Sequence, residues 1–225
     1  MRQFNALAGY PRPTKPRVVG PSIRTIHHRI TATYRDERYY DGDRNAGYGG
    51  FHYDGRWHAI AEGMCREYAL DDDSAVLQLN CEKGFLLHDL RELHPRMTVM
   101  GTELADYPME KAMPAVRSGI CKASPTRLPF ADRSFDLVLA IGVVYALTLG
   151  DAIACLREIQ RVSRKRSFVT LGAYRTEQEA KLFRYWTLLG ATVLHEDDWI
   201  EVLKHSGYDG DYHFMNARTL DLVGQ

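Results

Sequence analysis

The stretch LPFADRSFDLVLAIGVVYAL, residues 128–147, decides the fold that this sequence predicts. It contains the start of the most apolar run of the chain, which extends from Phe135 to Gly150. This run is too short to cross a bilayer, and an acid, Asp136, stands near its start. We therefore expect a buried central strand that leads into a loop.

Strand and helix patterns alternate on both sides of this strand. Further strands are expected at residues 75–80, 97–104, 118–122, 167–174 and 211–217, and helices at 56–70, 84–93, 106–116, 151–162 and 197–208. Such alternation predicts βαβ units, and hence an α/β domain with a mainly parallel sheet and helices on both faces. A ligand of such a sheet binds at the carboxyl ends of the strands, where the strand order reverses.

Four segments carry a family resemblance, and they are VLQLNCEKGFLL (76–87), GTEL (101–104), LPFADRSFDLVLAIGVVYAL (128–147) and LREIQRVSR (156–164). In this order and spacing the chain resembles class I S-adenosylmethionine-dependent methyltransferases of the small-molecule type. The resemblance implies a Rossmann-like, doubly wound sheet whose last strand is reversed. An unrelated doubly wound protein such as a dehydrogenase is disfavoured, because the sequence has neither a GxGxxG turn nor a phosphate-binding P-loop.

The resemblance also assigns a cofactor site for S-adenosylmethionine. Its expected residues are Gln78, Asn80, Cys81, Glu82 and Gly84 in the first turn, Glu103 and Leu104 after the second strand, Ser124 and Pro125 near the adenine, and Ile141 and Gly142 on the floor. The family usually has VLDxGCGxGxxL at the first strand and turn. Gln78 therefore replaces an acid, and Asn80 and Glu82 replace the first two glycines.

These replacements differ in their expected effect on the cofactor. Gln78 keeps a hydrogen-bond acceptor for an ammonium group, and Asn80 tolerates a positive φ. Glu82 places a carboxylate beside the expected position of the cofactor's own carboxylate, and this repulsion weakens binding by about a hundredfold or more. Two functions follow, either a divergent methyltransferase acting on a small molecule or saccharide, or a catalytically silent homologue that serves as a partner subunit or ligand-binding protein.

The acceptor site is expected around loops that carry aromatic side chains. Tyr48, Tyr53 and Trp57 stand on a glycine-rich frame that suits a mobile lid over a flat ligand. The other candidates are Tyr145 after the fourth strand, Tyr174 and Arg175 after the fifth, and His195 before the last helix. No catalytic residue is assigned, since methyl transfer from a sulfonium relies mainly on proximity and orientation.

Composition limits the partners. The 29 basic and 29 acidic side chains give a formal net charge of zero, which disfavours nucleic acid and anionic membranes. The nine histidines show no metal-binding spacing, and no GxSxG hydrolase motif is present. Four widely spaced cysteines and the lack of a signal-like segment predict a cytoplasmic protein. A homodimer fits either function, and a heterodimer with an intact methyltransferase fits the silent homologue.

Two regions are expected along the chain. Residues 1–55 would form an N-terminal arm and a tyrosine-rich lid, because proline, glycine and charged residues leave them without a core of their own. Residues 56–225 would form the methyltransferase-like domain.

Overall fold

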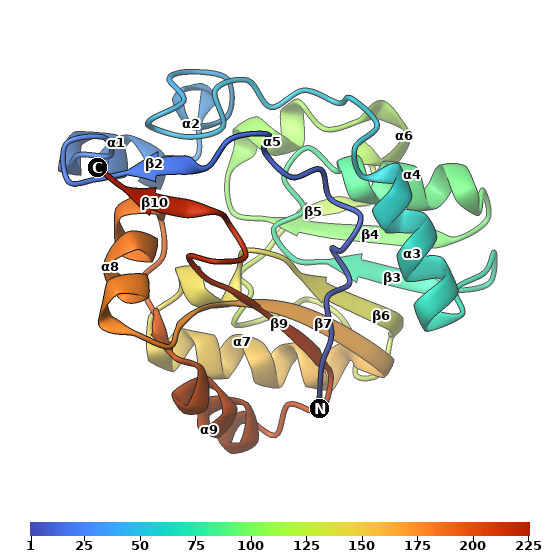
Figure 1. Cartoon of the computed structure of the whole chain (residues 1–225). Helices are drawn as coiled ribbons and strands as arrows, with labels where there is room; N and C mark the ends of the chain where they lie inside the picture. Colours follow the sequence, from blue (N-terminus) through green and yellow to red (C-terminus); the bar gives the residue numbers. More distant parts are fainter.

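The computed structural model describes all residues, 1–225, and it is built on a parallel sheet (Figure 1). The strands are β1 (Arg2–Gln3), β2 (Arg17–Val19), β3 (Ala75–Gln78), β4 (Thr98–Glu103), β5 (Ile120–Lys122), β6 (Phe135–Ala140), β7 (Ser163–Tyr174), β8 (Leu194–His195), β9 (Asp211–Met215) and β10 (Leu222–Gly224). The main sheet has the order β1-β9-β7-β6-β3-β4-β5, and β8 pairs with β7. The order reverses between β3 and β6, and the carboxyl ends of two such strands are where open α/β sheets generally bind ligands.

Helices cover both faces of this sheet. They are α1 (Ile26–Thr33), α2 (Glu37–Tyr40), α3 (His58–Tyr68), α4 (Phe85–Leu93), α5 (Asp106–Glu110), α6 (Pro114–Arg117), α7 (Leu149–Val162), α8 (Glu177–Trp186) and α9 (Glu196–Ser206), with a 3₁₀ turn η1 (Val144–Ala146). Helices α3 and α4 share one hydrophobic core with one face of the sheet, and α7, α8 and α9 share another with the opposite face. The predicted α/β fold with helices on both faces is therefore confirmed.

The central strand β6 shows why this pattern gives two cores. All six of its residues are buried. Leu137 and Leu139 belong to the core under α3 and α4, whereas Val138 and Ala140 belong to the core under α7. Because side chains alternate between the faces of a strand, a continuous apolar run is what a strand covered on both sides requires.

The two strongest sequence landmarks are joined physically. Glu158 on α7 accepts a hydrogen bond from the backbone N–H of Leu128 at 2.7 Å. Arg161 donates to the carbonyls of Phe130 (2.8 Å) and Leu128 (3.1 Å), and it pairs with Glu158 and Asp132. The helix thus fixes the loop that precedes β6.

The expected reversal of the last strand is wrong. Strand β9 runs parallel to β7, with Phe168 opposite Asp211 and Gly172 opposite Met215. The chain between β7 and β9 passes through α9. A helix that crosses over the sheet in this way brings the chain back to the starting end, so that the next strand runs parallel to the first. The chain then leaves the main sheet, and β10 pairs in parallel with β2.

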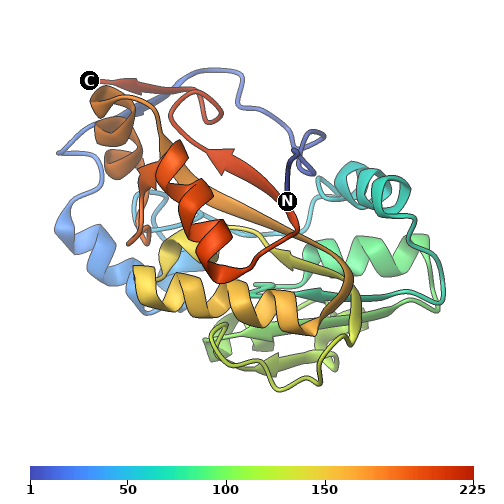
Figure 2. The same ribbon diagram turned by 90° about the horizontal axis from the view of Figure 1, so that it is seen from below.

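The N-terminal arm has more regular structure than expected. Strand β1 extends the main sheet beside β9, and β2 pairs with β10 in a second, two-stranded sheet. These pairings supply the hydrogen-bond partners that the arm lacks locally. Helix α1 lies at the same end of the molecule as α8 in both views (Figures 1 and 2), and Arg24 and Arg29 donate to the carbonyls of Trp186 and Thr187.

Two further helices differ from expectation. The helix expected over 106–116 is interrupted and forms α5 and α6, because Pro114 favours a new first turn over a helix interior. Helix α8 was not predicted, although Thr176 accepts from the N–H of Glu179 at its start. None of the helices combines the length and the apolar composition that a membrane span requires.

Candidate functional site

The turn between β3 and α4 keeps the backbone of a glycine turn although it has lost two glycines. Asn80, Glu82 and Gly84 all have left-handed backbone angles, with φ of +45°, +57° and +73°. Asn adopts this region readily, but for Glu it costs about 1 kcal/mol. The turn therefore leads from the end of β3 into α4 as the glycine pattern would, while its side chains differ.

Unpartnered acceptors are buried at this turn. The side-chain oxygens Oε1 of Gln78 and Oδ1 of Asn80 have no hydrogen-bond partner, and Thr102 Oγ1 on the neighbouring strand is also unpaired. A buried polar atom without a partner is destabilising, so such a group indicates a missing ligand or water. Two acceptor oxygens fit the amino group of S-adenosylmethionine, the chemistry that the sequence resemblance implies for this position.

Two carboxylates meet at the carboxyl ends of β3 and β4. Glu103 is fully buried and accepts hydrogen bonds from the backbone N–H groups of Glu82 and Leu104, the latter at 3.1 Å. Burial raises the pKa of Glu103. Its carboxylate holds the turn in place and keeps free lone pairs, which fits a second role as acceptor for ribose hydroxyls.

Glu82 is half-buried, and burial raises its pKa to about 7. The nearby Glu103 carboxylate adds to this rise, while the Tyr48 hydrogen bond and the charge of Arg35 oppose it. At neutral pH the Glu82 carboxyl is thus partly protonated, and the repulsion expected between Glu82 and the cofactor's carboxylate is reduced.

The lid segment, residues 34–53, lies directly against this turn. Tyr48 donates its hydroxyl hydrogen to Glu82 Oε1 at 2.5 Å. The Tyr48 ring lies 5.3 Å from that of Tyr39 and 5.9 Å from that of Tyr40. Burial raises the pKa of Tyr48 well above its ordinary value, so this phenol acts as a donor and not as a base.

Arg35 brings a positive charge to the two carboxylates. Burial acts to lower its pKa, but the oxygens of the nearby tyrosines and of Glu103 and Glu82 outweigh it, and the net shift is upward. Arg35 also has a positive φ of 49°. No sequence motif marks Arg35, because it lies 47 positions before Glu82 in an irregular segment.

A buried ion pair fastens the lid segment. Lys83 Nζ donates to both carboxylate oxygens of Asp41, at 2.9 and 2.7 Å, and to the carbonyl of Phe51 at 2.8 Å. The hydroxyl of Tyr107 and the N–H of Phe51 also donate to Asp41. These contacts hold the Asp41 pKa at about 2, so the Asp41 carboxyl is charged at neutral pH. Sequence reasoning overlooked both Asp41 and Lys83.

The remaining cofactor candidates lie at the same edge of the sheet. Cys81 is buried against Gly101, Pro125 is buried, Ile141 is half-buried, and Leu104 and Ser124 are exposed, with Ser124 Oγ 2.8 Å from Thr126 Oγ1. Gly142 has a φ of +76°, and a Cβ built on it would meet only the Tyr145 hydroxyl, at 4.0 Å. Free space therefore adjoins Gly142 at the end of β6.

The acceptor candidates do not converge on one point. Tyr145 is buried, and its pKa of about 12, raised mainly by burial, also reflects the charge of Glu82. Tyr53 donates to Asp89 on α4 at 2.5 Å, and Trp57 packs on Tyr10 with ring centroids 5.1 Å apart. Of the three lid aromatics, only Tyr48 contacts the turn between β3 and α4.

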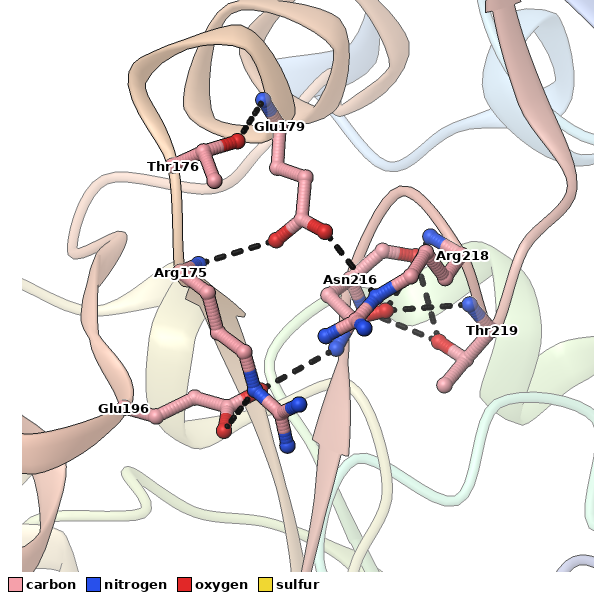
Figure 3. Close-up of polar contacts among 7 residues, drawn as sticks. All are labelled: Arg175, Thr176, Glu179, Glu196, Asn216, Arg218 and Thr219. Carbon is pink, nitrogen blue, oxygen red and sulfur yellow. Dashed lines mark hydrogen bonds and ion pairs between the residues drawn. The ribbon is translucent and has the colours of Figure 1, made fainter.

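Tyr174, Arg175 and His195 form a separate group near α9. The rings of Tyr174 and His195 lie 5.8 Å apart, and His195 Nδ1 accepts from the N–H of Asp197. Arg175 Nε donates to Glu196 at 2.6 Å, and its backbone N–H donates to Glu179 (Figure 3). Figure 3 also shows Arg218 on the other oxygen of Glu179, so this network ties α8, α9 and the loop after β9 together.

No group of three or more His, Cys, Asp or Glu side chains is arranged to hold a metal ion. Two cavities lie away from the turn. The larger, of about 500 Å³, lies between residues 4–9 and α3, and the smaller, of about 340 Å³, lies beside the N-terminus.

Comparisons with known proteins agree with the fold. A family model described as a methyltransferase domain matches residues 77–171. A malonyl-[acyl-carrier protein] O-methyltransferase of Legionella pneumophila is 29% identical over 102 residues, which are 43% of this chain and 36% of the relative. The match thus spans about a third of that protein's length.

Solved structures are similar at low sequence identity. A candidate methyltransferase of Bacillus halodurans superposes with a TM-score of 0.53 at 15% identity, covering 66% of this chain and 68% of the other. A candidate methyltransferase of Haloferax volcanii, solved in complex with the Trm112 methyltransferase activator, gives 0.50 at 18% identity, covering 67% and 74%. At these identities the likeness concerns the fold.

Proposed function

We propose that this chain, a member of the class I methyltransferase superfamily, binds S-adenosylmethionine at the turn between β3 and α4 and transfers its methyl group to a small molecule. One observation carries the proposal. The left-handed backbone of the turn is kept, and two buried acceptors, Gln78 Oε1 and Asn80 Oδ1, face no protein donor. Together they support an amino-acid ligand at this place.

Each group of the cofactor would have a residue at this edge of the sheet. Gln78 and Asn80 would accept hydrogen bonds from the amino group, and Glu103 from the ribose hydroxyls. Arg35 would compensate the negative charge of the cofactor's carboxylate beside Glu82. Bound there, the cofactor would supply an activated methyl group, and the residues of this chain would position an acceptor in line with it.

The acceptor would lie beside Gly142, where space is free and the Tyr145 hydroxyl is near. Tyr145 has a raised pKa, so it would orient the methyl acceptor by donating a hydrogen bond. Tyr48 already donates its hydroxyl hydrogen to Glu82, so it would offer the methyl acceptor only a lone pair. The lid segment would exclude water from this space. Tyr174, Arg175 and His195 remain candidates for the outer part of the site, and a small molecule or saccharide remains the proposed class of acceptor.

Calorimetric titration of the full chain with S-adenosylmethionine and S-adenosylhomocysteine tests the proposal. We expect binding of both ligands, and we expect Gln78→Leu to weaken it, since the leucine removes an acceptor and keeps the volume. Gln3→Leu, the same substitution at an exposed position on β1, is the matched control and should leave binding unchanged. No binding of either ligand at millimolar concentration would refute the proposal and favour the silent homologue.

A further inference from the structure

Four arginines lie close enough together to influence one another, and none of them has an acidic partner. Arg17 lies on β2, Arg24 precedes α1, Arg29 lies within α1, and Arg44 lies in the lid segment after α2. None forms an ion pair, whereas Arg38 nearby is paired with Asp36 at 2.6 Å. The ionisable side chains that face Arg17 from other elements are Arg44, Tyr10 and Asp221, and Asp221 does not reach ion-pair distance.

The donors of this group are largely unused. The Arg17 side chain makes no hydrogen bond to the protein, and Arg24 donates once, to the carbonyl of Trp186. Arg44 uses only Nη1, on the carbonyls of Gly47 (2.9 Å) and Tyr48 (3.1 Å). Arg29 is different, since both its terminal nitrogens donate to carbonyls at the end of α8. A guanidinium has five N–H donors, so Arg17, Arg24 and Arg44 retain most of theirs.

This arrangement is electrostatically unfavourable without an anion. Arg17 and Arg24 are half-buried. Burial, together with repulsion from Arg44 and the other arginines, lowers the pKa of Arg24 to about 10. Like charges placed together in a partly desolvated site destabilise the chain unless a ligand of opposite charge compensates them.

The group is connected to the proposed methyl-transfer site through Tyr39. Tyr39 lies close enough to Arg24 to influence its pKa, and the Tyr39 ring packs on Tyr48, which donates to Glu82. Arg24 also contacts the end of α8, on the side of the sheet where Phe183 of α8 packs against Tyr145 at 5.8 Å. The arginines therefore lie on the same side of the turn as Tyr145, and the rings of Tyr39 and Tyr48 connect them to Glu82.

We propose that Arg17, Arg24 and Arg44 bind an oxyanion, a carboxylate or a phosphate group, carried by the methyl acceptor. The proposal rests on the proposed function in one respect, because it assigns the anion to the acceptor of that reaction. Planar guanidinium groups suit both carboxylate and phosphate, since each offers paired oxygens to paired N–H donors. The substrate class is thereby narrowed to small molecules that carry an acidic group.

The test measures binding of inorganic phosphate and of malonate to the full chain, by thermal shift and calorimetry at constant ionic strength set with sodium chloride. We expect at least one probe to raise the melting temperature, and the tighter one identifies the anion. Arg24→Gln and Arg44→Gln should each lower the affinity for that probe by about tenfold or more. Arg38→Gln removes the same charge from a paired, exposed residue and should leave probe binding unchanged.

A second readout separates a binding role from a structural one. Without a probe, Arg17→Gln and Arg44→Gln should melt higher than the unmodified chain, since they relieve repulsion that only an anion compensates. If an arginine had only a structural role, its replacement would lower the melting temperature of the protein. Equal probe affinity in the unmodified chain and in Arg24→Gln and Arg44→Gln, or no effect of either probe, would overturn the proposal.

Binding of S-adenosylhomocysteine is measured on the same samples. It should be unchanged in all these variants, because the arginines are not assigned to the cofactor. If the cofactor product binds but the probes do not, the arginine site fails and the proposed function stands. If the probes bind through these arginines but the cofactor product does not, the anion site stands and the proposed function fails.

Discussion

Residues 128–164 and residues 78–84 serve the same sheet, but they relate to the family pattern in opposite ways. The first region keeps both its sequence motif and the contacts behind it, since Glu158 and Arg161 hold the loop before β6. The second keeps the left-handed backbone of the turn while glycines are replaced by Asn80 and Glu82. A scaffold can thus be retained by its packing while the charges at the turn between β3 and α4, here called the candidate ligand turn or simply the ligand turn, change.

The comparison also shows where the compensation lies. Glu82 is surrounded by groups from outside its own region, with Tyr48 and Arg35 coming from the lid segment. The loop before β6 is instead held by the helix that follows that strand. The contacts of both regions span 30 residues or more. Those of the loop before β6 join two segments of the family pattern, whereas those of the turn come from the lid segment, which lies outside that pattern.

Replacing Glu82 should have the largest effect. Glu82→Gly removes a carboxylate and its bulk and restores glycine at a φ of +57°, and we expect affinity for S-adenosylmethionine at pH 8, where the carboxyl is charged, to rise by more than about tenfold. Calorimetry measures it. Glu82→Gln is the matched control, because it removes the charge but keeps the bulk and the backbone cost. Unchanged affinity in Glu82→Gly would show that this turn does not limit binding.

The scaffold half of the comparison is tested at Arg161. Arg161→Leu leaves the carbonyls of Leu128 and Phe130 and the carboxylate of Glu158 without their donor, so we expect the free energy of unfolding to fall by about 2 kcal/mol. Urea denaturation measures the change. Arg157→Leu, on the same helix but exposed and in contact only with His205 at 3.4 Å, should change stability far less. Equal losses would contradict the special role of Arg161.

The pH dependence of cofactor binding reports on the ligand turn alone. Below the Glu82 pKa of about 7 its carboxyl is neutral and does not repel the cofactor's carboxylate, and above it the charge develops. Affinity should therefore fall by about tenfold from pH 6 to pH 8. Titrations across this range in Glu82→Gln should show a flat profile. A slope that persists in that variant would assign the effect to another group.

The smallest expected effect concerns the ion pair between Asp41 of the lid segment and Lys83 of the turn. Asp41→Asn keeps the acceptor geometry for Lys83 but removes the compensating charge, and we expect a loss of about 1 kcal/mol of stability. Hydrogen exchange should increase across residues 34–53 and remain unchanged in β6. Asp43→Asn, at an exposed position of the same loop, is the control. Exchange that rises equally in both variants would show that Asp41 does not fasten the segment.

Much of the scaffold could be predicted from the sequence, because periodic apolar patterns and local motifs determine it. The alternation around residues 135–140 led to the right layers, and Asn80 indicated that the turn could survive. The direction of β9 was predicted wrongly, since it depends on the crossover through α9 and not on the strand's own residues. Helix α8 could have been found from the Thr176 to Glu179 capping pattern.

The environment of the candidate site could not be predicted in the same way. Tyr48 meets Glu82 across 34 residues, and Asp41 meets Lys83 across 42. Neither pair has a spacing that a motif could record, and both depend on how an irregular segment lies on the sheet. The pKa of Glu82 follows from that placement, so the sequence alone overstated the repulsion at the turn.

The pairing of β2 with β10 has a consequence for access to the turn between β3 and α4. Residues 17–19 are bound to residues 222–224, and Asp41 is bound to Lys83, so the intervening chain is anchored at both ends. A segment tethered in this way cannot swing about one hinge, and its opening requires one anchor to detach. The last strand, remote from the turn in sequence, would then govern how fast a ligand enters and leaves.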